Sequence, residues 1–149
     1  MKQIKLMNAS GIDVDTLLDI DYECYEEPWT KTQFLQALKK DKVVVAKNGT
    51  KIVGYIVYFI DVSGDVEIFN IALIDNYRRC GIGTLMMNMI ENLHPGRIMI
   101  SVIETNLGAH LFLRALGYTC TKILHGDYLS ELYGPTNCYL FEKEVSQPA

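Results

Sequence analysis

The stretch between residues 65 and 93 constrains this chain most, because a strand pattern there passes into a helical pattern through a glycine-containing turn. Apolar residues of strand type run up to Ile74, and helix-spaced apolar residues begin at Leu85. Between them stands the sequence Asn76-Tyr77-Arg78-Arg79-Cys80-Gly81-Ile82-Gly83-Thr84. Such a strand-to-helix turn aims unpaired backbone N–H groups and the positive end of the helix dipole at one point. The sequence therefore predicts a cradle for a phosphate or pyrophosphate group.

The residue types of this turn agree with close contact to an anion. Gly81 and Gly83 have no side chain to hold a ligand away from the backbone, and glycine adopts positive φ readily. Arg78 and Arg79 add positive charge at the rim. An ordinary strand-to-helix loop is the alternative. The third glycine of a dinucleotide fingerprint and the Lys-Ser/Thr of a P-loop are both missing, so these two motifs are set aside.

Length and composition favour a single domain. The chain has 149 residues, 49% of them hydrophobic, which is enough for one core and too short for two ordinary domains. We expect this domain to span residues 1–145 and residues 146–149 to form a flexible tail. No apolar run approaches the roughly 18 residues of a membrane span, and the N-terminus lacks a signal-peptide core. A soluble, cytoplasmic protein is expected.

The charged residues bear on the partners of the chain. A net charge of −4 argues against a nucleic-acid surface, which needs clustered Lys and Arg. The acidic stretch at residues 23–27 could attract an ammonium group, or it could be ordinary solvated surface. The four cysteines form no C-x-x-C pair, and the three histidines show no ligand spacing relative to them. We therefore expect neither a metal site nor a disulfide framework.

Periodicity and turn residues predict the order of the elements. Strands are expected at residues 2–7, 43–46, 52–60, 65–74, 98–103, 118–124 and 138–142, and helices at 12–24, 30–39, 81–93 and 107–116. Thr30 and Gln33 form a capping box, and Asn48-Gly49 is a pair typical of type I′ hairpin turns. A polar loop with Tyr128, Tyr133 and Pro135 is expected between the last two strands. The order predicts an α/β protein with a mixed sheet and helices on both faces.

The motif Arg78-x-x-Gly81-x-Gly83 resembles the coenzyme A signature of the GNAT acetyltransferase superfamily. The resemblance extends from Lys2 to about Glu144, and within the superfamily it favours the bacterial ribosomal-protein-alanine N-acetyltransferases and the catalytic subunits of N-terminal acetyltransferases. The segments that carry it are Pro28-Trp29-Thr30 with Phe34, Glu67 to Leu73, Thr105-Asn106 and Leu116-Gly117-Tyr118. It implies a single GNAT fold with a mixed, mostly antiparallel sheet flanked by helices.

The resemblance implies acetyl-CoA as the cosubstrate and assigns residues to it. The pantetheine arm is expected to pair with the edge of the strand at residues 71–73, as an added peptide strand would. The pyrophosphate is expected on the N–H groups from Arg79 to Thr84. Asn106 matches a cofactor contact of the family, although an ordinary helix N-cap is an equal alternative. The expected cofactor-binding residues are Ile71, Ala72, Leu73, Arg78, Arg79, Cys80, Gly81, Ile82, Gly83, Thr84 and Asn106.

Amine acetylation needs a neutral amine, a polarised carbonyl and a proton for the departing thiolate. A backbone N–H near Ile71 can polarise the carbonyl. Glu67 is the preferred base, because a period of two places it on the same face as Phe69 and Ile71, and it matches the catalytic glutamate of the histone-acetyltransferase branch. A solvated residue near a strand end is the alternative for Glu67.

Two positions depart from the alanine N-acetyltransferases that the chain resembles. Ser101 stands where these enzymes have a glutamate base, and Leu113 where they have a tyrosine acid. Tyr128 is a candidate substitute for the proton donor, with ordinary packing as the alternative. Cys80 beside Arg79 is interpreted as a loop residue, because no histidine can be placed near it for nucleophilic catalysis.

The expected function is direct transfer of an acetyl group from acetyl-CoA to an amine in a ternary complex. An α-amine with a pKa near 8 costs about 1 kcal/mol to deprotonate at pH 7, whereas a lysine costs about 4 to 5 kcal/mol. A site with one uncertain base therefore favours the N-terminal α-amine of a protein. The alternatives are a small amine acceptor, such as a polyamine, aminoglycoside or amino acid, and a catalytically impaired acetyl-CoA-binding module that regulates a partner. A homodimer is also left open.

Overall fold

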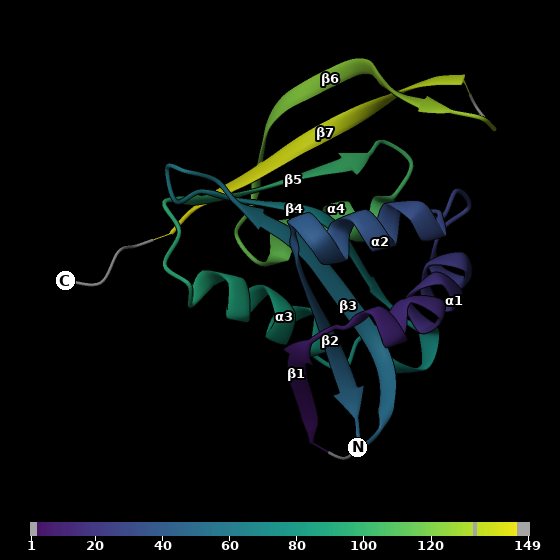
Figure 1. Cartoon of the computed structure of the whole chain (residues 1–149). Helices are drawn as coiled ribbons and strands as arrows, with labels where there is room; N and C mark the ends of the chain where they lie inside the picture. Colours follow the sequence, from purple (N-terminus) through teal and green to yellow (C-terminus); the bar gives the residue numbers. More distant parts are fainter. Residues whose placement is uncertain (1–2, 133, 146–149) are drawn as a thin grey trace. The chain divides into compact units, whose positions relative to one another are not determined.

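The computed structural model describes residues 3–132 and 134–145 (Figure 1). Tyr133, the tail at residues 146–149 and the first residue of the expected N-terminal strand lie outside the described residues. The elements follow one another in the predicted order. They are β1 (Ile4–Asn8), η1 (Gly11–Asp13), α1 (Val14–Cys24), α2 (Lys31–Lys40), β2 (Lys42–Asn48), β3 (Lys51–Ile60), β4 (Val66–Leu73), η2 (Asp75–Tyr77), α3 (Ile82–Glu91), β5 (Arg97–Ile103), α4 (Leu107–Ala115), β6 (Thr119–Ser130) and β7 (Gly134–Glu144).

The strands have the hydrogen-bonded order β1-β2-β3-β4-β5-β7-β6. The pairs β1–β2, β2–β3, β5–β7 and β6–β7 are antiparallel. The pair β4–β5 is parallel, and its register joins Val66–Ile68 to Ile98–Ile100. The expectation of a mixed, mostly antiparallel sheet with helices is therefore confirmed.

The chain forms two compact units, and β4 passes from one to the other. The first unit contains the chain up to Phe59 together with Phe69–Ile90, and the second contains Ile60–Ile68 and the chain from Glu91 onward. The domain boundary expected at residue 145 stays a prediction.

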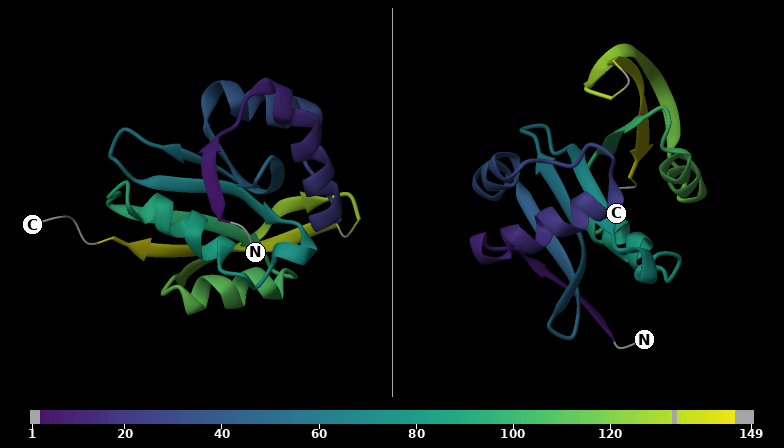
Figure 2. Two further views of the ribbon diagram at one scale, coloured as in Figure 1. Left: turned by 90° about the horizontal axis from the view of Figure 1, so that it is seen from below. Right: turned by 90° about the vertical axis from the view of Figure 1, so that its right-hand side faces the viewer.

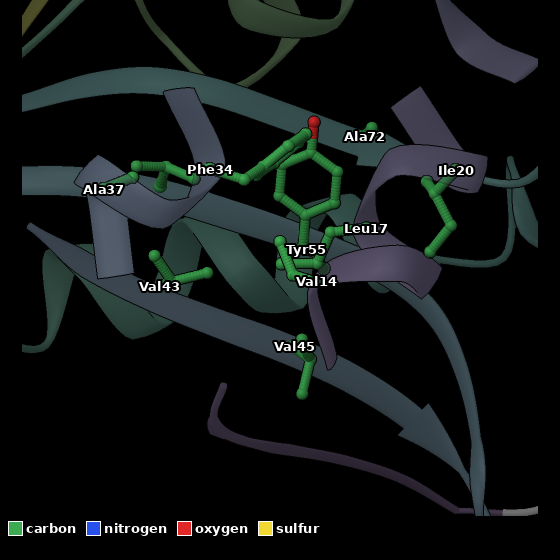
Figure 3. Close-up of a cluster of buried hydrophobic side chains, with 10 residues drawn as sticks. Val14, Leu17, Ile20, Phe34, Ala37, Val43, Val45, Tyr55 and Ala72 are labelled. Carbon is green, nitrogen blue, oxygen red and sulfur yellow. The ribbon is translucent and has the colours of Figure 1, made fainter. Parts of the chain in front are cut away.

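The core of the first unit lies between its first two helices and the strands β2, β3 and β4 (Figure 3). Val43 and Val45 point into it because alternate residues of β2 share one face. Phe34 of α2 is fully buried and meets the Tyr55 ring edge-on, with centroids 5.4 Å apart. α3 lies on the opposite face of these strands from α1 and α2 (Figure 2). The loop between α1 and α2 therefore connects two helices that both pack on this core.

Two local predictions in this unit have different outcomes. The capping box is confirmed, because the Gln33 N–H donates to the Thr30 hydroxyl at 3.2 Å and the Thr30 N–H donates to the Gln33 amide oxygen at 2.8 Å. The β2–β3 hairpin is also confirmed, but its type I′ turn on Asn48-Gly49 is wrong. Asn48 pairs with Lys51, and only Gly49 has a positive φ, of 64°. The turn is therefore made by Gly49 and a β-branched residue, Thr50, that avoids the left-handed region.

In the second unit α4 packs on β7 through its buried histidine. The His110 ring lies 3.2 Å from the Ile103 carbonyl and meets the rings of Tyr139 and Phe141 edge-on. The strands β6 and β7 form a longer hairpin than the sequence indicates. Tyr128, expected in a loop, lies on β6 opposite Thr136. The pairing register shifts between residues 124 and 128, where turn-like residues stand. The polar loop expected there is therefore wrong at Tyr128 and Pro135, which both lie on paired strands.

Candidate active site

The turn between β4 and α3 has the geometry of an anion cradle. After η2 the backbone is extended at Arg78, left-handed at Arg79 with φ 61°, and left-handed again at Gly81 with φ 82°. The first helical bond runs from the Leu85 N–H to the Gly81 carbonyl at 2.9 Å, which leaves the N–H groups of the first turn without intrahelical partners. Residues 78–81 are exposed, and a Cβ on Gly81 would meet no atom within 4 Å. Open space thus lies in front of a positively polarised turn, as a pyrophosphate requires.

The two glycines of the motif have different backbone conformations. Gly81 uses the positive φ that the sequence predicts, whereas Gly83 lies inside the first turn of α3 and is not among the left-handed residues. Arg79 supplies the second left-handed position. Such a φ is uncommon outside glycine, and observed strain of this kind concentrates at functional sites. No pattern in the sequence indicates it.

The two arginines of the cradle also differ. The Arg78 side chain turns back, with Nε donating to the Leu73 carbonyl at 3.0 Å and Nη1 paired with the Asp75 carboxylate at 2.9 Å. Its guanidinium therefore fixes the cradle to the end of β4. Arg79 is exposed at the apex of the turn.

One edge of β4 faces α1, and it contains the residues that the sequence assigns to the pantetheine arm. The Tyr25 hydroxyl donates to the Ile71 carbonyl, and the Cys24 thiol lies 3.2 Å from the Leu73 carbonyl. The Ile74 N–H instead bonds to the Val53 carbonyl of β3. Since alternate residues direct their backbone groups to opposite edges, the groups of Ile71 and Leu73 face away from β3.

Side chains of β4 do not alternate regularly before this edge. Tyr55 and Phe59 are four residues apart on β3 and share a face. Phe69 stacks on Phe59 with centroids 6.4 Å apart, and the next residue, Asn70, donates to the Tyr55 hydroxyl at 2.8 Å. Two consecutive residues thus reach the same face, which is the mark of an irregularity in a strand. The simple period of two that placed Ile71 on the face of Phe69 is therefore wrong.

A buried carboxylate that the sequence analysis missed lies beside this edge. Asp21 is 1% exposed. It accepts hydrogen bonds from the Tyr55 hydroxyl, from Asn70 Nδ2 at 3.1 Å and from the Trp29 N–H at 2.6 Å. A signal was available, because Asp21 follows Val14 and Leu17 at the spacing of the buried stripe of α1. A charged residue on such a stripe needs partners inside the protein.

Burial keeps the hydroxyl and thiol groups around Asp21 protonated. Burial, with the charge of Asp21 as a second cause, raises the pKa of Tyr25 and of Tyr55 well above its usual range. Burial also raises the pKa of the Cys24 thiol, against a smaller lowering from Arg78. At neutral pH these groups are hydrogen-bond donors rather than anions.

An open groove is lined by side chains of α2, of the residues that flank it and of Phe69 on β4. Its volume is about 320 Å³, and it is lined by the side chains of Trp29, Gln33, Gln36, Ala37, Lys40, Asp41 and Phe69. Both aromatic residues of its lining pack on a second ring. The Trp29 ring packs on Phe34, and Phe69 stacks on Phe59. Desolvation raises the pKa of the Asp41 carboxyl. The groove is a partly apolar surface that includes Phe69, two residues before Ile71 on β4.

Comparison with known proteins decides the family. The acetyltransferase (GNAT) family matches residues 14–118, which is more than half of the chain. The chain belongs to this family. An uncharacterized N-acetyltransferase of Methanocaldococcus jannaschii is 27% identical over 126 residues, which cover 80% of each chain.

Two solved N-acetyltransferase structures illustrate the shared fold. The ribosomal-protein-S18-alanine N-acetyltransferase of Escherichia coli superposes with a TM-score of 0.84 and 16% identity, over 99% of this chain and 97% of its own. Arabidopsis thaliana NAA60, in complex with a bisubstrate analogue, has a TM-score of 0.84 and 17% identity, over 98% of this chain and 100% of its own. The chain is an acetyl-CoA-dependent GNAT N-acetyltransferase.

The other predicted residues of this GNAT chain belong to the second unit. Glu67 lies on β4 opposite Met99 and is exposed, so its carboxyl is not buried among apolar side chains. The Asn106 side chain accepts from the Ala109 N–H at 3.2 Å, which is the N-cap alternative. Tyr128 is 36% exposed. Ser101 is exposed on β5, whereas Leu113 is buried in α4.

The described residues show neither a membrane span nor a metal-binding cluster. Residues 3–132 and 134–145 contain no helix long and apolar enough to cross a membrane. The same residues contain no group of three or more His, Cys, Asp or Glu side chains that could hold a metal ion. None of the four cysteines, all of which the structure describes, forms a disulfide bond, and Cys80 is exposed in the cradle with its Sγ 3.5 Å from the Arg78 carbonyl.

Proposed function

We propose that this GNAT enzyme acetylates the N-terminal α-amine of a protein by direct attack on acetyl-CoA in a ternary complex. The observation that carries the proposal is the open groove between α2 and Phe69. Phe69 precedes Ile71 by two residues on the same strand. A polypeptide whose amine meets the thioester at the β4 edge therefore has a surface on which its following residues can lie. The Escherichia coli relative likewise acts on an alanine of a ribosomal protein.

The cofactor half of the proposal uses the cradle and the β4 edge. The N–H groups from Arg79 to Thr84 would hold the pyrophosphate, with Arg79 adding charge at the rim. The backbone N–H groups of Ile71 and Leu73, which face away from β3, would pair with the pantetheine arm, whereas the backbone of Ala72, also expected in this role, faces β3. The Ile71 N–H would stabilise the oxyanion as the amine attacks. Arg78 contributes mainly by bracing the turn, because its guanidinium already bonds Leu73 and Asp75.

The proton chemistry of the proposal needs only a modest base. An α-amine is about 1 kcal/mol from its neutral form at pH 7, so a water-relayed proton transfer to an exposed carboxylate is sufficient. Glu67 is the residue proposed for this role. Tyr128 is proposed as the donor to the departing thiolate, and Asn106 as a cofactor contact besides its capping bond.

One observation favours a second candidate, an impaired acetyl-CoA-binding module. The position of the family's tyrosine acid is occupied by Leu113, which is 2% exposed and has no proton to donate. Such a module would bind acetyl-CoA tightly but turn over no amine. Glu67→Gln separates the two candidates, because it lowers kcat in an enzyme and changes nothing in a module.

An acceptor screen at saturating acetyl-CoA tests the proposal, with released thiol as the readout. The acceptors are peptides with free N-termini, peptides with a blocked N-terminus and an internal lysine, and polyamines. Turnover of the free N-termini is expected. Acetylation confined to polyamines would reject the protein substrate, and no turnover with tight cofactor binding would favour the module.

Gly83→Val tests the cradle separately by titration with acetyl-CoA. Gly83 is helical, so valine adds bulk without forcing a positive φ, unlike a substitution at Gly81. We expect a loss of affinity of at least about tenfold, or 1.4 kcal/mol. Gly11→Val is the matched control, because a Cβ there meets no atom within 4 Å and φ is not positive. Unchanged affinity in Gly83→Val would contradict the assignment.

A further inference from the structure

We propose that Asp21 is a positioning residue for the amine acceptor, acting through the loop that carries Trp29. The proposal rests on the proposed function in one respect, namely that the acceptor lies in the groove of which Trp29 forms a wall. Asp21 is buried and cannot touch the acceptor itself. Its role is to hold Trp29, which forms one wall of the groove, in place relative to the β4 edge.

The loop between α1 and α2 is closed by Asp21 at both ends. The Tyr25 N–H donates to the Asp21 backbone carbonyl at 2.9 Å, and the Trp29 N–H donates to its carboxylate oxygen Oδ2 at 2.6 Å. Between these two bonds the chain is irregular, and Pro28 has no N–H to contribute. One residue thus sets where the loop leaves α1 and where Trp29 begins the approach to α2.

The second carboxylate oxygen connects the same loop to the strands. Oδ1 accepts from the Tyr55 hydroxyl of β3 and from Asn70 Nδ2 of β4. Asn70 directly precedes Ile71, whose carbonyl accepts the Tyr25 hydroxyl. The loop, the central strand and the strand edge proposed to hold the thioester are therefore linked through one carboxyl group. A shift of Asp21 would move Trp29 relative to Ile71.

A carboxylate suits this position because its bonding partners are all donors. Each oxygen of Asp21 accepts, and the three donors come from neutral groups. An asparagine would keep the shape but present an NH2 group either to the Trp29 N–H or to Asn70 and Tyr55. A donor facing a buried donor leaves a polar group unsatisfied, at a cost of about 1 to 3 kcal/mol. The loop can relieve this cost by moving.

Asp21→Asn is the central experiment, with Asp19→Asn as the matched control. Asp19 lies on the same helix two residues earlier and is exposed. We expect Asp21→Asn to raise the acceptor KM about tenfold or more, since 1.4 kcal/mol corresponds to a factor of ten, while the acetyl-CoA Kd stays within about twofold. A merely structural role would weaken both ligands together or neither.

Fluorescence gives a readout that does not depend on turnover. Trp29 is the single tryptophan of the chain, and its backbone N–H donates to the Asp21 carboxylate. Its emission is expected to move to longer wavelength in Asp21→Asn, well below the unfolding temperature, and to stay unchanged in Asp19→Asn. Unchanged emission together with an unchanged acceptor KM would overturn the proposal, as would a parallel rise of the acceptor KM and the acetyl-CoA Kd.

Tyr55→Phe serves if Asp21→Asn does not fold. It removes one donor to Asp21 and keeps the bond to Trp29, so a rise of about threefold in the acceptor KM is expected, with an unchanged acetyl-CoA Kd. An unchanged KM there would also overturn the proposal. Kinetics use whichever acceptor the wild type turns over. If no peptide in the screen is acetylated, the protein substrate is rejected. If Asp21→Asn changes neither the acceptor KM nor the Trp29 emission, the role of Asp21 is rejected.

Discussion

Two buried tyrosines, one in each unit, have opposite hydrogen-bonding situations. Tyr55 on β3 is 0% exposed, and its hydroxyl donates to Asp21 and accepts from Asn70. Tyr118, just before β6, is 2% exposed, and its hydroxyl has no hydrogen-bond partner among the residues that the structure describes. Burial is the same in both, so the difference lies in what each hydroxyl does. The Tyr55 hydroxyl links separate elements beside the proposed acceptor loop. The Tyr118 hydroxyl links none of the described elements, because this tyrosine contributes through the packing of its ring.

The surroundings of Tyr118 support this interpretation. Lys143 Nζ lies 5.6 Å from the centre of its ring, and the same amine pairs with the Glu91 carboxylate at 2.7 Å and donates to the Leu116 carbonyl at 2.8 Å. The polar contacts of Lys143 thus do not include the Tyr118 hydroxyl. A buried polar atom therefore indicates a positioning network only where its partners come from several elements.

Asp21→Ala is expected to have the largest effect on stability. It leaves the Tyr55 hydroxyl, the Asn70 amide and the Trp29 N–H without their shared acceptor, at about 1 to 3 kcal/mol for each group that stays unsatisfied. We expect the unfolding free energy from urea denaturation to fall by at least about 3 kcal/mol. Asp19→Ala is the control. A loss below about 1 kcal/mol, on the order of an ordinary surface change, would mean that the network can be dispensed with.

The pH dependence of stability should reveal both tyrosines together. Burial raises the pKa of Tyr55 and Tyr118 above the value of about 10 in the unfolded chain. The folded state therefore keeps two protons that the unfolded state loses above pH 10, so stability is unaffected below that pH and falls above it. Each tyrosine contributes about 1.4 kcal/mol per pH unit, or roughly 3 kcal/mol for the pair.

Urea denaturation between pH 9 and 11.5 measures this slope. Phenylalanine at either position is expected to reduce the slope by about 1.4 kcal/mol per pH unit, and Tyr25 and Tyr58, whose pKa burial also raises, continue to contribute. Tyr22→Phe, at a position that is 77% exposed, should leave the slope as it is. A slope that neither buried variant reduces would contradict the raised pKa values.

Tyr55→Phe comes next in the size of its effect at neutral pH. The change keeps the ring against Phe34 and removes one donor from Asp21, whose other two donors remain. A loss of about 1 to 2 kcal/mol is expected from urea denaturation at pH 7. A neutral result would show that the hydroxyl contributes as little here as the partnerless one of Tyr118.

Much of the fold could be predicted from the sequence because its signals are local. Hydrophobic periodicity and Gly or Pro breaks set the order of strands and helices, and Thr30 with Gln33 fixed one helix start. The residue type allowed a positive φ at both Gly81 and Gly83, and only Gly81 adopts it. The long β6–β7 hairpin was missed, because its glycines sit within paired strands and resemble turn residues locally.

The parts of the site that escaped prediction depend on contacts between distant residues. Asp21 lies 34 residues from Tyr55 and 49 from Asn70, and each of the three looks ordinary in its own segment. The left-handed Arg79 is set by how the turn packs, because an arginine carries no preference for that conformation. The irregularity at Phe69 and Asn70 depends on β3. The sequence therefore pointed to the glycine-containing turn but not to the carboxylate behind the loop between α1 and α2.

Tyr118→Phe is expected to have the smallest effect, and it bears most directly on how the two tyrosines differ. Removing a buried hydroxyl without a partner relieves its desolvation cost, while the ring keeps its contact with Lys143. The unfolding free energy at pH 7 should stay the same or rise by up to about 1 kcal/mol, against a loss in Tyr55→Phe. A loss of similar size in both variants would mean that the Tyr118 hydroxyl has an ordered water as its partner, since buried waters commonly satisfy such groups. The two tyrosines would then differ only in the nature of the acceptor, and the distinction between a linking hydroxyl and a packed ring would no longer hold.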